Sequence, residues 1–236
     1  HRMYLKDYGI WVEQTATDRT GMYRLTFTQD SDADILVNLG GYIASTTMRN
    51  ADVKKVSNNE IEGSFDTYGR HWGGPENVKV HFVIRFDKDF ERLDGWRDKE
   101  RYSDIDTLQG SSIITRRHPK EELSYLDSPT SGVSAHYRVK TGDKICVRTA
   151  ISYVSVDNAR ENLENDAVTW DFDLVKKTSQ DEWNKWLGRI EVKGGSQKQR
   201  TKFYTDLWHV LLGRHKIDDV NGEYPDLTEG ERYYSY

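Results

Sequence analysis

The sequence has few cysteines and prolines, no excess of basic residues and no long hydrophobic run. Its single Cys146 cannot form a disulfide within the chain, and the apolar segment around it predicts a small buried side chain rather than a nucleophile. Lys and Arg number 34 against 39 Asp and Glu, so no basic face for phosphates is indicated and we expect no nucleic-acid partner. No apolar run approaches the length of a membrane span.

The familiar nucleotide and zinc motifs are also missing. The chain contains neither G-x-x-x-x-G-K nor G-x-G-x-x-G between a strand and a helix, and it contains no H-E-x-x-H. His209 and His215 stand six residues apart on or just past an expected helix, so they would not face a common metal. We therefore predict no nucleotide site and no zinc site.

The segment IDDVNGEYPDLTEGE has the acidic and amide residues of a calcium loop, but not their full order. If Gly222 is the turn glycine, Asp219 and Asn221 occupy ligand positions. Ile217 and Thr228 then stand where two essential carboxylates are required. We favour a solvated turn after a helix, and predict no metal site within the chain.

Most of the first 154 residues alternate between apolar and polar side chains with a period of two. In VKVHFVIRF, residues 78–86, alternate side chains form one dry face and one wetter face, which is typical of an antiparallel strand. Further strands are expected at 35–39, 60–68, 133–139 and 144–154, and short strands at this spacing indicate an antiparallel β-sandwich over 1–154. Residues 92–131 are charged and poorly periodic, and we expect a surface excursion there with one or two short strands.

From Ser155 onward the period changes to that of helices. A helix is expected to begin at Ser155, and a helical linker is expected over 155–190. A capping box at 196–199 predicts the start of another helix in the segment 191–236. Each of these two segments is expected to carry a wide, mostly apolar stripe along one side of its helix. In the linker the stripe consists of Phe172, Val175, Ser179, Trp183, Trp186, Leu187 and Ile190. In the last helix it consists of Phe203, Tyr204, Leu207, Trp208, Leu211 and Leu212.

The stripe of the last helix has to pack against something. Burying such side chains is worth about 1.5–3 kcal/mol each, so six exposed ones would forgo something near 10 kcal/mol. The helix either caps one sheet of the sandwich or belongs to a helical layer that continues past Tyr236, and the residues leave both possibilities open.

One loop has the composition of a sugar-binding site. In TYGRHWGGPENVKV, Arg70, His71 and Trp72 lie between two expected strands, and an aromatic ring beside cationic and amide groups suits a sugar ring and its hydroxyls. The alternative is a wide hairpin whose Trp covers the edge of the sandwich. Glycoside cleavage needs a pair of carboxyl groups at a defined separation, and none of the 39 acidic residues is singled out for this role.

Three segments together resemble one family. DYGIWVEQTATDRTGMYRLTF, AISYVSVDNARENLENDAVTWDFDLVKKTSQDEWNKWLGRIEVKGG and QRTKFYTDLWHVLLGRHKIDDVNGEYPD are similar, in this order, to stretches of glycoside hydrolase family 92. The matching stretches run from residue 8 to about residue 226, with no pattern in 92–131. The resemblance implies a mainly β fold, with an antiparallel β-sandwich followed by linker helices and the first helix of a truncated (α/α)6 barrel domain.

The resemblance also implies a function. Members of this family are calcium-dependent α-mannosidases, mostly exo-acting and inverting, so the full-length parent is expected to remove terminal α-linked mannose from glycans. The general acid Glu, the base Asp and the calcium ligands of the family would lie beyond Tyr236, in the parent's own C-terminal barrel domain, and this span alone is expected to be inactive. A secreted or periplasmic location is implied as well. Trp72 matches a Trp common in the family, whereas the residues around it depart from the family pattern.

Two other kinds of function are open. The span could be a carbohydrate-binding or interaction β-sandwich module that works without a barrel. It could also be an assembly surface that uses Phe203, Leu207 and Leu211.

Overall fold

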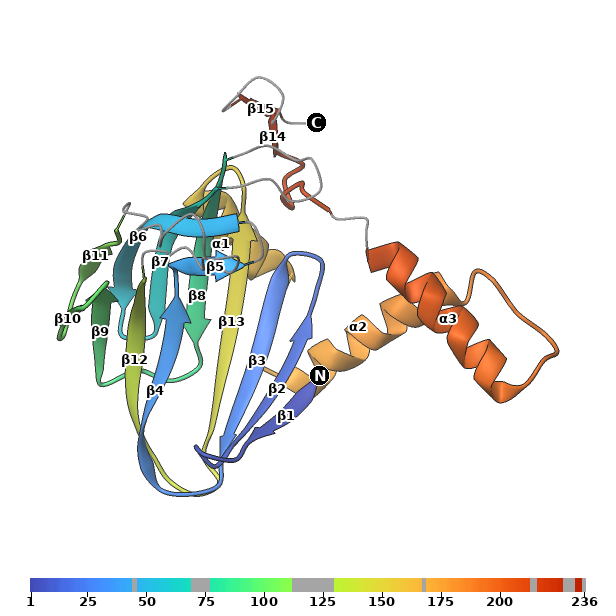
Figure 1. Ribbon diagram of the computed structural model, residues 1–236, viewed down its shortest axis with the longest axis horizontal. Coiled ribbons are helices and arrows are strands. Elements are labelled where there is room, and N and C mark those ends of the chain that lie inside the picture. The colour runs from blue at the N-terminus through green and yellow to red at the C-terminus, as the bar shows by residue number, and fades with distance from the viewer. Residues whose placement is uncertain are drawn as a thin grey trace, which may run out of the picture.

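The alternating segments of the first 152 residues form two antiparallel sheets that pack face to face (Figure 1). The structure, a computed structural model, describes residues 1–43, 46–68, 77–111, 130–166, 169–212, 216–226 and 232–234. The larger sheet has the spatial order β1 (Arg2–Leu5), β2 (Ile10–Ala16), β3 (Thr20–Phe27), β13 (Lys144–Ser152), β8 (Asn77–Phe86), β7 (Glu60–Tyr68), β6 (Thr46–Ser57) and β11 (Thr107–Gln109), with β5 (Gly41–Ile43) paired to β6. The smaller sheet has the order β10 (Glu100–Tyr102), β9 (Arg92–Arg97), β12 (Ser131–Val139) and β4 (Ser31–Asn38).

The core lies between the two sheets and is rich in aromatic side chains. Phe86 of β8 is fully buried, and its ring lies 5.9 Å from Phe90 and 6.1 Å from Tyr137 of the facing sheet. The inward side chains on β8 are the apolar alternate residues predicted from the sequence, and Ile145 and Val133 continue the same core on β13 and β12. The expected antiparallel β-sandwich is therefore confirmed.

Residues 92–131 differ from the surface excursion that we expected. Within the described part of this segment, β9 is an inner strand of the smaller sheet and buries Leu93 to 1% exposure. The alternation of apolar and polar residues along β9 is hard to see in the sequence. Its outward residues Arg92 and Asp94 are charged, with Arg92 Nε 2.9 Å from Asp94 Oδ2, and the inward residue after Leu93 is Gly95. A Cβ there would lie 2.6 Å from Ile105 Cδ1, so a larger residue at position 95 would displace the Ile105 side chain. Residues 112–129 lie outside the described part.

Within the described residues, three helices follow the sandwich: α1 (Val156–Asp166), α2 (Phe172–Leu187) and α3 (Gln197–Leu212). Ser155 caps α1, since its Oγ accepts the amide of Asn158 at 3.0 Å, as predicted. The predicted capping box at α3 also forms, with Ser196 Oγ 3.3 Å from the amide of Gln199 and Gln199 Oε1 2.8 Å from the amide of Ser196. None of the described helices is long and apolar enough to cross a membrane.

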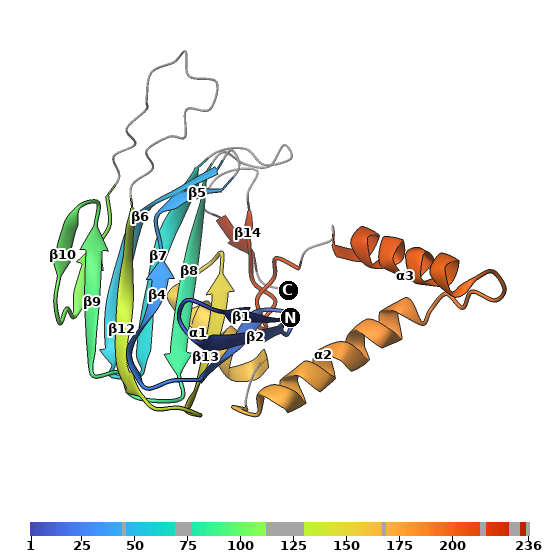
Figure 2. The same cartoon turned by 60° about the horizontal axis from the view of Figure 1, so that its bottom comes forward.

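The last two helices form an arm that projects from the sandwich (Figures 1 and 2). We call α2, the connection 188–196 and α3 the helical arm. Only the first turns of α2 are buried on the sandwich, and α3 has no buried residue. Of the two possibilities left open by the sequence, the capping of a sheet by α3 is therefore wrong. The chain then returns to the sandwich and ends the described part in a short hairpin, β14 (Tyr224–Asp226) and β15 (Arg232–Tyr234).

Candidate functional site

The outer face of the larger sheet, the face turned away from the smaller sheet, receives the helical part of the chain. Helix α1 packs on it through Ala159 and Leu163, which are fully buried against Val83 and Ala150 of the sheet. Burial of two such side chains is worth a few kcal/mol, on the order of 1.5–3 kcal/mol for the Leu. The sheet is therefore covered on both faces at this point, which explains why Val83 is apolar on the otherwise wetter side of β8.

A group of ion pairs fixes α1 to the same face. Arg160 of α1 bonds to Glu60 and Glu62 of β7, and Arg85 of β8 also bonds to Glu60. Burial alone would raise the pKa of Glu60, but the hydrogen bonds from Arg160 and Arg85 outweigh it and lower the pKa below its ordinary value. Glu60 is therefore an ionised structural anchor, and it is not suited to donate a proton as a general acid near neutral pH.

The start of α2 is attached by a second charged contact. Asp171 caps the helix by accepting the amides of Asp173 and Leu174 at 3.1 Å. Arg24 of β3 lies 2.7 Å from Asp173 and 2.8 Å from Glu13, and its guanidinium carbon is 4.5 Å from the ring centroid of Phe172. These contacts and the burial of Phe172 set the direction in which the helical arm leaves the sandwich.

The most buried polar group joins the sandwich, α1 and the segment after α3. We call Ser152, Asn158, Asn162 and Asp219 the Asp219 cluster. Asp219 is 3% exposed; its Oδ2 accepts from Ser152 Oγ at 2.6 Å and from Asn158 Nδ2 at 2.8 Å, and its Oδ1 accepts from Asn162 Nδ2 at 2.6 Å. Asn162 returns a bond, because its Oδ1 accepts the amide of Val220 at 2.9 Å. The segment after α3 is thereby held at the end of β13.

Charged side chains surround the Asp219 cluster. Arg19, in the turn between β2 and β3, donates from Nε to the carbonyl of Asp218 at 2.7 Å and lies 3.6 Å from Asp166 at the end of α1. Lys216 Nζ lies 2.8 Å from Asp18 of the same turn. A cavity of about 270 Å³ lies beside these groups, between the β2–β3 turn, the end of β13 and residues 216–219.

These contacts correct the sequence-based view of IDDVNGEYPDLTEGE. We favoured a solvated turn, yet Asp219 and Val220 are held by side chains of α1. The turn itself is tight, with Gly222 at a φ of 86° and its amide 2.9 Å from the carbonyl of Asp219. Both carboxylate oxygens of Asp219 accept hydrogen bonds from neutral donors, so the structure gives this residue a positioning role.

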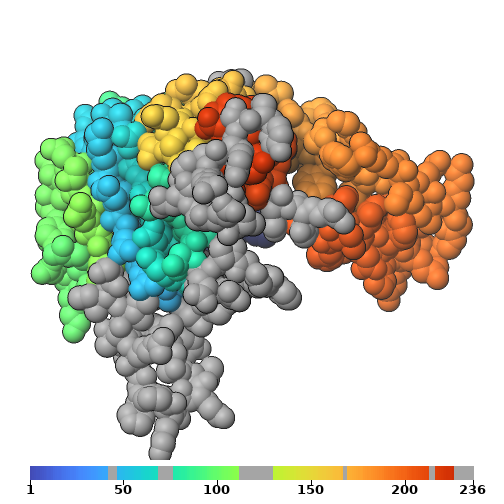
Figure 3. Space-filling model, turned by 90° about the horizontal axis from the view of Figure 1, so that it is seen from above, coloured from blue at the N-terminus to red at the C-terminus, as the bar shows by residue number. Residues whose placement is uncertain are grey.

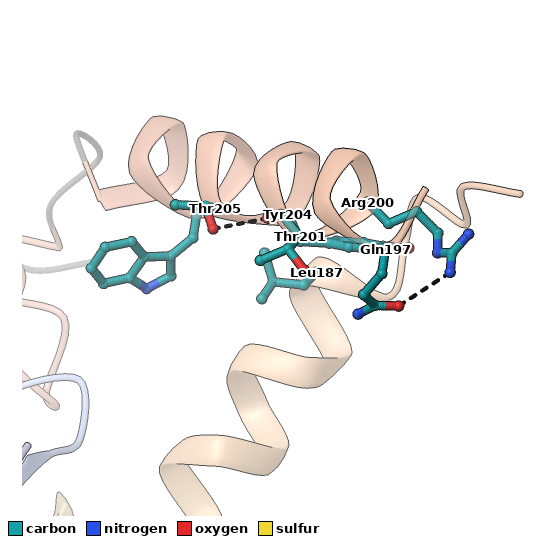
Figure 4. A pocket seen from close by; sticks show the side chains of 7 residues that line it. Leu187, Gln197, Arg200, Thr201, Tyr204 and Thr205 are labelled. Carbon is teal, nitrogen blue, oxygen red and sulfur yellow. Dashed lines mark hydrogen bonds between the residues drawn. The ribbon is translucent and has the colours of Figure 1, made fainter. Parts of the chain in front are cut away.

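The helical arm carries the other notable surface feature, a groove of about 670 Å³ between the end of α2 and α3 (Figure 4). Leu187 of α2 lines it from one side, and Tyr204 and Trp208 of α3 from the other. Tyr204 also holds the connection between the helices, since its hydroxyl donates to the carbonyl of Ile190 at 3.0 Å. Trp183 and Trp208 meet across the arm with ring centroids 6.1 Å apart.

The sugar-binding residues predicted from the sequence, Arg70, His71 and Trp72, lie outside the described residues. The strands that flank them are described: β7 ends at Tyr68 and β8 begins at Asn77, paired in register. No group of three or more His, Cys, Asp or Glu side chains suited to hold a metal ion occurs within the described ranges.

The Asp219 cluster is the feature that reasoning from the sequence missed. One signal was available, because Asn158 and Asn162 are four residues apart on the face of α1 that also carries the apolar Ala159 and Leu163. Two amides on a buried helix face indicate a buried polar partner. The sequence does not say which acidic residue, some 60 positions further on, supplies it.

Comparisons with known proteins agree with this arrangement. Residues 1–152 match the model of the glycosyl hydrolase family 92 N-terminal domain, and residues 158–236 match that of the family's catalytic domain. A comparison with curated proteins finds no match. Among solved structures, the family GH92 α-mannosidase BT3965 from Bacteroides thetaiotaomicron is similar with a TM-score of 0.79 and 22% identity, over 100% of this chain and 29% of that one.

Two further structures are similar. BT3965 in complex with mannoimidazole gives a TM-score of 0.78 and 24% identity, over 100% of this chain and 28% of that one. The inverting mannosidase BT2199 from Bacteroides thetaiotaomicron gives a TM-score of 0.78 and 18% identity, over 99% of this chain and 28% of that one. The chain thus spans less than a third of the length of these structures.

Proposed function

The chain belongs to glycosyl hydrolase family 92, and from this membership we propose that it is the N-terminal part of an inverting exo-α-mannosidase that removes terminal α-linked mannose from glycans. The observation that carries the proposal is that the two parts of one chain match the two domains of one glycosidase family in the family's order. The names of the similar structures, which are α-mannosidases and include a complex with mannoimidazole, support the choice of mannose as the sugar.

Within such an enzyme, this span would serve as the mount of the catalytic helical domain and as one wall of its sugar pocket. The Asp219 cluster supports this role, because it ties the segment that follows α3 to the sandwich through several short hydrogen bonds. Helix α3 supports this role too, because its apolar side chains are not buried and would pack against further helices. Arg70, His71 and Trp72 are proposed to contribute to the pocket wall.

The bond cleavage itself is assigned to the rest of the parent. Inversion needs a carboxylic acid that protonates the leaving oxygen and a carboxylate that activates water on the opposite face of the sugar. The acidic residues described above are engaged in ion pairs, helix caps and hydrogen bonds that hold the fold, and following the family resemblance we propose that the acid Glu and the base Asp lie beyond Tyr236. Following the same resemblance, the calcium ligands of the parent are proposed to lie there as well.

The proposal is tested by comparing the complete parent protein with the chain 1–236. We expect the parent to hydrolyse p-nitrophenyl α-mannoside and to release β-mannose first, as followed by proton NMR of the anomeric signals. We expect the chain 1–236 to be inactive on the same substrate. Turnover by the chain 1–236 alone would contradict the scaffold role, and a parent without activity on any α-mannoside would contradict the proposed reaction.

A binding experiment separates this function from that of a self-sufficient sugar-binding module. Chemical shifts of the labelled chain 1–236 are followed while methyl α-mannoside is added to tens of millimolar. We expect no localised shifts if the pocket also needs walls from the rest of the parent. Saturable shifts at millimolar concentration would favour a module that binds sugar by itself.

A further inference from the structure

One arginine on the outer face of the larger sheet has a buried donor without an acceptor. Arg49, near the start of β6, stacks its guanidinium on the ring of Tyr68, with the guanidinium carbon 3.2 Å from the ring centroid. Its Nε is buried and has no hydrogen-bond partner, and its side chain forms no ion pair with any residue in the described ranges. A guanidinium carries five N–H donors in one plane, and such donors are normally paired when they are removed from water.

The obvious partner for Arg49 is present but is used by other residues. Asp66 of β7 lies directly opposite Arg49 in the strand register. Its Oδ2 instead accepts from Asn50 Nδ2 at 2.8 Å, and its Oδ1 lies 4.0 Å from Lys79 Nζ. Arg49 is therefore turned away from its cross-strand carboxylate and toward Tyr68, whose ring holds the guanidinium flat but offers Nε no acceptor.

The backbone next to Arg49 is irregular. The register between β6 and β7 shifts between Arg49 and Asp52, and Asn50 within this bulge has a φ of 55°. The amide of Asn50 reaches across to the carbonyl of Ser111 at 3.2 Å, so the bulge is fixed from outside the strand pair. Asn adopts this left-handed backbone more readily than most residues, and bulges occur preferentially at sheet edges and next to active sites, where they redirect a side chain.

The register places Arg49 on the same face of the sheet as the attachment of the helical part. Ser152, which holds Asp219, pairs with His81, and His81 pairs with Ser64. The row formed by Arg49 and Asp66 lies two residues further along β7, about 7 Å, and Arg49 on β6 is three strands away from β13, about 14 Å across the sheet. Tyr68 is the last residue of β7 before the segment that contains Arg70, His71 and Trp72. Arg49 thus lies on the face that receives the helical part, against Tyr68, with which β7 ends.

We propose that Arg49 and Tyr68 form a substrate-binding element in which the guanidinium donates hydrogen bonds to neighbouring hydroxyl oxygens of a neutral sugar in the glycan. The planar donors of Arg suit two adjacent oxygens. A neutral ligand fits better than an anion, because the charges of Arg49 and Lys79 are balanced by those of Asp66 and Asp52 in the same patch of sheet. This inference rests on the proposed function and adds a specific binding residue to it.

The test uses the complete parent protein with Arg49→Met, Arg49→Lys and the control Lys54→Met. Lys54 is on the same strand, and its ammonium is exposed and paired with Glu62 at 3.2 Å. For each variant, kcat and KM are measured on the 1,2-, 1,3-, 1,4- and 1,6-linked α-mannobioses, the affinity for methyl α-mannoside and for these disaccharides is measured by calorimetry, and the Tm is recorded.

We expect Arg49→Met to lower kcat/KM for the preferred disaccharide by about 10- to 100-fold, chiefly through KM, as for the loss of charge-assisted hydrogen bonds. The affinity for the same sugar should fall in parallel, while the Tm stays equal or rises because an unpaired donor is removed. Arg49→Lys should recover only part of the loss, since an ammonium cannot reproduce the planar donors. Lys54→Met should match the wild type.

Each other outcome overturns the inference. Unchanged kcat/KM and affinity in Arg49→Met would show that Arg49 does not bind sugar. A lower Tm with unchanged kcat/KM would show that its acceptor is a protein group of the parent. If the wild type binds these sugars without hydrolysing them, the proposed reaction fails while the inference is still decided by the affinities. If the wild type neither binds nor hydrolyses them, both fail.

Discussion

The sandwich and the helical arm have similarly apolar stripes but bury them to very different extents. In the sandwich, Ile61, Phe86 and Ile145 are fully buried between two sheets. In the arm, Trp186, Trp208 and Leu212 are 41%, 37% and 39% exposed, and Figure 3 shows the arm extending beyond the body of the sandwich. The difference teaches that the sandwich is stabilised by its own contacts, whereas the arm leaves its apolar stripes largely uncovered, as expected if it packs against further helices of the proposed parent.

The largest expected effect comes from a cavity in the core. Phe86→Ala should lower the free energy of unfolding of the chain 1–236 by about 3–5 kcal/mol, because it removes a ring enclosed by both sheets. Trp208→Ala should cost less than about 1 kcal/mol in the same chain and distinctly more in the complete parent. Urea unfolding followed by circular dichroism measures both. Equal losses of the free energy of unfolding from the two variants in the chain 1–236 would mean that the side chains of the arm stabilise this chain as much as those of the sandwich core.

The Asp219 cluster should give the next largest effect. Asp219→Ala leaves the donors of Ser152, Asn158 and Asn162 without their acceptor, and we expect a loss of about 2–4 kcal/mol. Asp218→Ala is the matched control, because this neighbour is 39% exposed and should cost less than about 1 kcal/mol. Hydrogen exchange of the Val220 amide reports the release of the segment directly. An unchanged exchange rate in Asp219→Ala would mean that the cluster does not hold the segment.

Acid should loosen the attachment of the arm before it affects the core. The hydrogen bond from Arg24 lowers the pKa of Asp173 from an ordinary 3.8 to about 2, and the same cause lowers the pKa of Glu13. Because the folded-state values lie below the unfolded ones, this stabilisation is present above about pH 4 and is lost as the pH falls toward 2.

Arg24→Met should therefore show a weaker fall of Tm between pH 5 and pH 2 than the wild type. Arg2→Met is the control, since Arg2 is 58% exposed and lies 3.9 Å from Glu13, and it should keep the wild-type dependence. Parallel Tm curves for Arg24→Met and the wild type would exclude this contact as an acid-sensitive attachment.

The smallest expected effect concerns the buried thiol under α2. Burial raises the pKa of Cys146 to about 11, with a further increase from Asp87. At pH 8 only on the order of one thiol in a thousand would be ionised, so the folded chain should react very slowly with Ellman's reagent. One equivalent should react after unfolding in guanidinium chloride. Rapid reaction of the folded protein would mean that the contact of α2 with the sheet opens readily.

The parts that the sequence predicts well depend on local patterns. The strand 60–68 and the inward residues of β8 follow from a period of two, and the caps at Ser155 and Ser196 follow from residue types at fixed spacing. Strand β9 was missed because its outward residues are charged and its inward position 95 is glycine, so it lacks a clear alternation.

The candidate site is harder to predict because it is made by contacts between distant residues. Asp219 meets side chains that precede it by 57 to 67 positions, and an Asp followed by Asn-Gly looks like any polar turn. The sequence suggests that Arg49 is an ordinary surface residue of a strand; its unpartnered Nε follows from the register shift and from the engagement of Asp66 with Asn50, which only the fold shows. Such relations depend on the packed fold, and no window of sequence contains them.

The bond from Arg19 to Asp218 joins residues 199 positions apart and has a consequence for how the protein could be cut. Helix α2 leaves from one point on the sandwich, and residues 216–219 return to another. The helical arm is thus attached to the sandwich at both of its ends. A protease that cleaves between α2 and α3, around 188–196, should yield two fragments on a denaturing gel that still elute together as one native particle. The break in the polypeptide would free neither piece.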